Sequence, residues 1–69
     1  MKVKDILNIL ENGTLISIYD STLDDILVMP MYLGANATLD NGIKYVYGDR
    51  KVLIINTHNE DDDIELVIK

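Results

Sequence analysis

The chain has no cysteine, no tryptophan and no phenylalanine, and it has a single proline in 69 residues. Without cysteine there is no disulfide and no thiolate ligand, so zinc sites built on cysteine are excluded. This length predicts a single domain, residues 1–69, which buries only about 60% of the surface of its unfolded chain. The aliphatic residues and four tyrosines must therefore supply the core, alone or with a partner chain.

Basic residues are also scarce, since six Lys and Arg stand against twelve Asp and Glu, for a formal net charge of −6. Direct binding to nucleic-acid phosphates or to an anionic membrane needs clustered Lys and Arg, so neither is expected. No apolar run approaches the ~20 residues that span a bilayer. Lys4, Asp5 and Asn8 also interrupt the start of the chain, where a signal peptide would be apolar. We therefore expect a cytoplasmic protein.

The first element is predicted to be a helix over residues 3–11. Its apolar residues recur at i, i+3, i+4 and i+7, as on one face of a helix: Val3, Ile6, Leu7 and Leu10. Asn12-Gly13 then supplies a residue that ends a helix in the left-handed conformation. A helix of nine residues is not stable alone, so this stripe is expected to pack on a sheet.

Alternating apolar residues and turn signals then predict strands over residues 14–20, 25–33, 43–47, 51–57 and 64–69. Pro30 lacks an N–H, so the second strand is expected at an edge or to be bulged. The consecutive apolar residues 52–55 suit a central strand covered on both faces. Residues 48–50 are predicted as a hairpin turn, residues 59–63 as the last turn, and residues 35–40 allow a helical turn. The fold class is α+β: an N-terminal helix packed on a small, mostly antiparallel sheet of about five strands.

Negative charge is concentrated near the end of the chain. Residues 52–69 carry five acidic residues against one lysine, whereas residues 1–51 carry seven against five basic residues. The five acidic residues are Glu60, Asp61, Asp62, Asp63 and Glu65. Asp20, Asp24 and Asp25 form a second acidic turn. The sequence leaves open whether both groups lie on one surface.

Three uses of the acidic segment are compatible with the sequence. A solvated hairpin tip would keep the chain soluble and discourage association of strand edges. A weak Ca²⁺ or Mg²⁺ site is the second, although no glycine lies among Asp61, Asp63 and Glu65 as in a calcium loop, and no metal ligand is assigned. The third is imitation of phosphates, since alternate strand residues about 6.7 Å apart would face a basic groove of another protein.

Tyrosine and methionine supply the candidate interface residues. Tyr45 and Tyr47 are candidate anchors for a partner, because buried aromatic residues dominate many interfaces. Met29, Met31 and Tyr32 surround Pro30 and are either core residues or the edge of a homodimer.

No catalytic or cofactor motif accompanies these residues. His58 is the sole histidine, and its neighbour Thr57 would point to the opposite face of a strand. The four glycines are isolated and none precedes a Lys-Ser or Lys-Thr pair, so no nucleotide cofactor is expected. We expect a protein that is not an enzyme and has no cofactor.

The opening of the chain resembles short phage-encoded proteins of low-GC Gram-positive hosts. The resemblance rests on Val3-Lys4-Asp5-Ile6-Leu7 and on Leu15-Ile16-Ser17-Ile18-Tyr19-Asp20, under a third of the chain. Some small acidic phage proteins, anti-CRISPR proteins among them, inhibit a host complex by occupying its nucleic-acid site. The resemblance thus implies an inhibitor of a host protein or ribonucleoprotein, acting on its basic residues. The alternative hypothesis is a self-associating structural or regulatory module.

Overall fold

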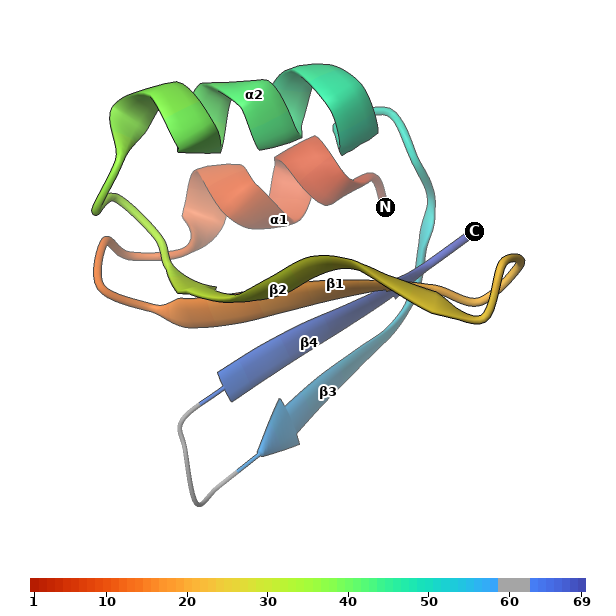
Figure 1. Ribbon diagram of the computed structural model, residues 1–69. Helices are drawn as coiled ribbons and strands as arrows, with labels where there is room; N and C mark the ends of the chain where they lie inside the picture. The colour runs from red at the N-terminus through yellow and green to blue at the C-terminus, as the bar shows by residue number, and fades with distance from the viewer. Residues whose placement is uncertain (59–62) are drawn as a thin grey trace.

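The computed structural model describes residues 1–57 and 63–69 in full and the backbone of His58. Its elements run in the order α1 (Val3–Ile9), β1 (Leu15–Asp20), β2 (Asp25–Tyr32), α2 (Ala37–Tyr47), β3 (Val52–His58) and β4 (Asp63–Ile68). Both helices cover the same face of the sheet, and no described element covers the other face (Figure 1). The α+β class and the N-terminal helix are thereby confirmed.

The sheet has the strand order β2-β1-β4-β3. Each hairpin, β1–β2 and β3–β4, is antiparallel, and the two hairpins meet through a parallel pairing of β1 with β4. The sheet is therefore mixed, with four strands where about five were expected. The parallel centre requires a long connection between the hairpins, and α2 provides it.

The strand predicted over residues 43–47 is instead the second half of the helix α2. Asn36 caps this helix, since its side-chain oxygen accepts a hydrogen bond from the backbone N–H of Leu39 at 3.1 Å. Ile43 and Tyr47 share the face that packs on the core, whereas Tyr45 is 92% exposed. Residues 43, 45 and 47 alternate as in a strand, and residues 43 and 47 also lie one helical turn apart. The strand prediction is wrong because both periods fit this segment. The predicted hairpin turn at residues 48–50 is likewise wrong, because it links α2 to β3.

The core lies between the helices and the central strands. Ile16 and Ile18 of β1 and Leu66 and Ile68 of β4 are fully buried there. The apolar stripe of α1 is confirmed, with Val3, Ile6 and Leu7 buried, although the helix ends at Ile9. Gly13 follows with a φ of 91°, a left-handed conformation that favours glycine.

The strand β3 is an edge strand and not the central strand predicted from its apolar run. The register with β4 shifts between Val52 and Ile54, so the alternation of faces is interrupted there. Leu53, Ile54 and Ile55 are 44%, 53% and 46% exposed. The expected edge position of the Pro30 strand is confirmed, since β2 forms the opposite edge. Among the described residues, no helix combines the length and apolarity needed to cross a membrane.

Candidate functional site

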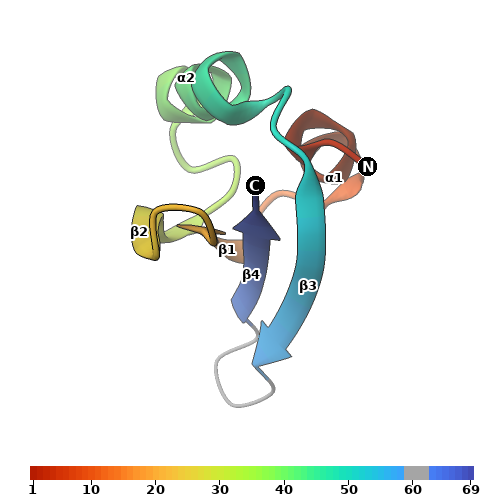
Figure 2. The ribbon, with the colours of Figure 1, turned by 90° about the vertical axis from the view of Figure 1, so that its right-hand side faces the viewer.

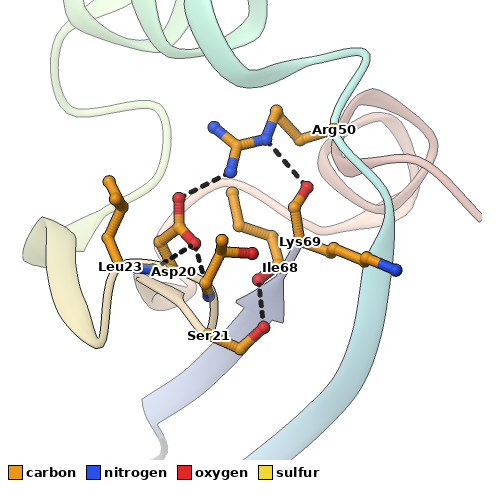
Figure 3. A network of polar contacts seen from close by, with 7 residues as sticks. Asp20, Ser21, Leu23, Arg50, Ile68 and Lys69 are labelled. Carbon is orange, nitrogen blue, oxygen red and sulfur yellow. Dashed lines mark hydrogen bonds and ion pairs between the residues drawn. The ribbon is translucent and has the colours of Figure 1, made fainter.

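Asp20 lies at the end of β1, and its side chain is only 1% exposed (Figure 3). Its Oδ2 accepts a hydrogen bond from Nη2 of Arg50. Its Oδ1 accepts hydrogen bonds from the backbone N–H groups of Thr22 at 2.8 Å and Leu23 at 3.2 Å. The bond from Arg50 is the largest cause that lowers the pKa of Asp20 below its ordinary value of 3.8, and the two backbone bonds lower it further.

The same network fastens the end of the chain. Arg50 donates from Nε to the carbonyl of Lys69 at 2.8 Å, and the Ser21 hydroxyl donates to the carbonyl of Ile68 at 2.9 Å. The network therefore joins the β1–β2 turn, the α2–β3 link and the end of β4. Both oxygens of Asp20 are used in these contacts, so the cluster holds the fold together and offers no free acid to a ligand. The sequence predicts Asp20 only as part of an acidic turn, because no spacing indicates its pairing with Arg50.

Asp63 and the turn that holds Asp24 and Asp25 lie at opposite ends of the sheet. In the parallel pairing, Asp63 lies beside Leu15 at the start of β1, and Ile68 lies beside Asp20 at its end. Five residue steps of about 3.3 Å separate these ends, or roughly 16 Å. Asp24 and Asp25 thus belong to a different surface from Asp63. Of the other predicted partner-binding residues, Glu60, Asp61 and Asp62 lie outside the described residues.

Asp63 and Glu65 belong to what we call the open sheet face, the face without helices. Paired residues of neighbouring strands share a face, so the neighbours of Ile16 and Ile18 in sequence point away from the core. The open sheet face consists of Leu15, Ser17, Tyr19, Ile26, Tyr32, Ile54, Asn56, Asp63, Glu65 and Val67. Ile26, Tyr32 and Ile54 on it are 50%, 60% and 53% exposed. This surface combines acidic and exposed apolar residues.

A small depression in this surface, which we call the sheet-face hollow, has a volume of about 100 Å³. Its lining includes Ser17, Tyr19, Ile26, Pro30, Asp63 and Glu65. Glu65 accepts a hydrogen bond at Oε1 from Nδ2 of Asn56, at 3.1 Å. Asp63 Oδ1 is buried and has no hydrogen-bond partner within the described part of the chain. The hollow therefore has acidic groups on the β4 side and apolar groups on the β2 side.

The predicted tyrosine anchors lie elsewhere. Tyr45 and Tyr47 belong to α2, which covers the other face of the sheet (Figure 2). Tyr45 projects into solvent, and Tyr47 packs against the core. The aromatic residue that lines the sheet-face hollow together with Asp63 and Glu65 is Tyr19, which the sequence patterns do not single out.

The predicted self-association residues are divided between two surfaces. Met29 and Met31 line an apolar groove of about 760 Å³ between β2 and α2, together with Leu39 and Val46. Tyr32 lies on the open sheet face instead. Met31 packs against the core, which suits the core interpretation. Met29 is 69% exposed, which suits the interface interpretation.

No group of three or more His, Cys, Asp or Glu residues within the described ranges is arranged to hold a metal ion. Comparison with protein-family models, with curated proteins and with solved structures finds no match.

Proposed function

We propose that this chain is a non-enzymatic binding protein that covers a basic surface of another protein in the cytoplasm of a host cell. The observation that supports it is the position of Asp63 and Glu65 on a sheet face that is open and also exposes apolar residues. Solubility alone needs charge but no apolar groups beside it. An interface needs both, since apolar contacts supply affinity and charges supply orientation and rate.

The target class that fits is a complex that handles nucleic acid, such as a CRISPR effector. Such complexes hold phosphates with Lys and Arg, and these are the residues that a protein of net charge −6 attracts. Once bound, the chain would keep DNA or RNA out of the same groove. Occlusion of this kind requires no chemical step and no cofactor.

The size of the surface limits which contacts matter. Four strands about 4.8 Å apart and about 20 Å long give a face on the order of 400 Å² in projection. A stable interface buries about 800 Å² per partner. The open sheet face is therefore about half of what is needed, and the acidic residues 60–62, which precede Asp63 in the sequence, would have to contribute. Exposed ion pairs are worth only about 0–1 kcal/mol each, so Tyr19, Ile26 and Ile54 are the proposed apolar anchors.

The test compares two variants with the same composition and charge. Asp62→Asn/Asp63→Asn and Asp24→Asn/Asp25→Asn each remove two negative charges, and Asp63 lies at the opposite end of the sheet from Asp24 and Asp25. Asparagine is also tolerated at Asp24, whose φ is 54°. The assay is inhibition of DNA cleavage by purified CRISPR effectors, at low and at high salt.

We expect the first variant to lose inhibition and the second to retain it, and we expect inhibition to weaken as salt rises. Equal effects of the two variants would show that only net charge matters. Absence of inhibition by the unaltered chain for every effector type would refute this target class.

The groove beside β2 supports a second candidate function, self-association. Met29 is exposed at this edge strand, and the groove next to it is apolar. This candidate predicts a dimer in light scattering that Met29→Asp disrupts and that high salt does not weaken. Met31 is the poorer choice for substitution because it also packs against the core.

A further inference from the structure

We infer that the sheet-face hollow is a receptor for the side chain of one lysine or arginine of the partner. The inference rests on the proposed function and names the group that the open sheet face would recognise. It uses described residues alone: Ser17, Tyr19, Ile26, Pro30, Asp63 and Glu65.

The first argument concerns polar groups that are left without partners. Ser17 is only 6% exposed, and no side-chain hydrogen bond within residues 1–57 and 63–69 involves its hydroxyl. Asp63 Oδ1 is buried and has no hydrogen-bond partner within the described part of the chain, and both residues line the hollow. Buried polar groups in folded proteins are nearly always paired, so the unpaired oxygen of Asp63, with the Ser17 hydroxyl in the same hollow, indicates a ligand that supplies hydrogen bonds.

The second argument concerns the kind of ligand. Two carboxylates and a hydroxyl are acceptors, and a carboxylate bonds most strongly to a charged donor. A lysine ammonium offers three donors and an arginine guanidinium offers five. A metal ion fits less well, because the hollow offers only two carboxylates and one of them already bonds to Asn56.

The third argument concerns shape. A volume of about 100 Å³ holds a few water molecules and is far smaller than the pockets that bind whole cofactors. It is of the right order for the head group of one side chain. Tyr19, Ile26 and Pro30 line the other side, where the methylene groups of a lysine or arginine would lie. The tyrosine ring adds a face that attracts cations.

The experiment is a titration of the full chain by ¹H–¹⁵N NMR with two short peptides, Gly-Gly-Lys-Gly-Gly and Gly-Gly-Arg-Gly-Gly. A third peptide with norleucine in place of lysine keeps the methylene chain without the charge. Two variants block the hollow in different ways. Ser17→Leu fills it at constant charge, and Asp63→Asn removes one acceptor charge at constant shape. Asp25→Asn is the matched control at the other end of the sheet.

We expect millimolar binding of a charged peptide, with shifts confined to the backbone amides of Ser17, Tyr19 and Glu65. Asp63→Asn should weaken it at least about tenfold, or 1.4 kcal/mol, Ser17→Leu should abolish it, and Asp25→Asn should leave it unchanged. The peptide that binds more tightly identifies the side chain. Equal binding of the norleucine peptide, or shifts that extend to Asp24 and Asp25, would overturn the inference.

This result is separable from the test of the proposed function. If the peptides fail to bind while the chain still inhibits an effector, the receptor is wrong and the function stands. If the peptides bind at the hollow while no effector is inhibited, the receptor stands and the proposed target is wrong.

Discussion

Substitution of Leu66 and of Leu53 by alanine tests whether β4 or β3 is the central strand of the sheet. Leu66 is 0% exposed in β4 between two strands, whereas Leu53 is 44% exposed in the edge strand β3. Leu→Ala at a fully buried site costs about 2–5 kcal/mol, because it loses transfer free energy and leaves a cavity. At Leu53 only about half of a burial term of about 1.5–3 kcal/mol is lost, and no enclosed cavity forms. We therefore expect about 1 kcal/mol or slightly more for Leu53→Ala.

These free energies are large for a chain of this length. At about 0.05–0.15 kcal/mol per residue, 69 residues give a free energy of unfolding of roughly 3–10 kcal/mol. Leu66→Ala thus removes between a fifth of the stability and all of it. Urea denaturation followed by circular dichroism measures both variants, and a slope near 1 kcal/mol/M converts the difference into a midpoint shift of about 1 M or more.

A refuting result is a cost for Leu53→Ala that equals or exceeds the cost for Leu66→Ala. That order would follow if the apolar run of residues 52–55 were central, as the sequence suggested. If Leu66→Ala does not fold, Leu66→Met serves instead. Because it nearly conserves volume, it should cost less than about 1.5 kcal/mol and leave the midpoint measurable.

Three further predictions concern the pairing of Asp20 with Arg50, the N-terminal cap of α2 and the backbone conformation of Gly13. Since the pKa of Asp20 is lowered in the folded state, its contribution is complete above pH 3.8 and is lost as the pH falls through the lower folded value. Arg50→Gln should therefore reduce stability at pH 7 and flatten the acid limb of a stability–pH curve; an unchanged limb would contradict the role of Arg50. Asn36→Ala should cost about 1 kcal/mol in thermal unfolding, because α2 loses its N-terminal cap, while Asn36→Ser should restore most of it. Gly13→Ala should destabilise by at least about 1 kcal/mol because its φ is positive, whereas no strain is expected for Gly42→Ala inside α2.

The local patterns along the chain were sufficient for several elements. The spacing of Val3, Ile6 and Leu7 predicts α1, and the missing N–H of Pro30 predicts the edge position of β2. The alternation of Leu66 and Ile68 predicts β4. Each of these signals arises within one element, from backbone geometry and from which side chains share a face, so a single sequence contains it.

The helix α2 was missed because residues 43–47 satisfy two periods at once. Ile43, Tyr45 and Tyr47 alternate as in a strand, and Ile43 and Tyr47 also lie one helical turn apart. The choice depends on the apolar face that α1 and the sheet present, which is a tertiary contact. The error then carried over to β3, because without a crossover helix there was no reason to pair β1 with β4.

For the candidate site, too, some features follow from the sequence and others only from the tertiary structure. From the sequence alone follow a net charge of −6, the concentration of acidic residues near the end of the chain and the absence of cysteine chemistry. Only the tertiary structure decides that Asp24 and Asp25 lie at the opposite end of the sheet from Asp63, that Arg50 pairs with Asp20, and that Ser17, Asp63 and Glu65 line one hollow. Charge and composition are sums over the chain, whereas proximity between residues 17 and 63 depends on which strands pair.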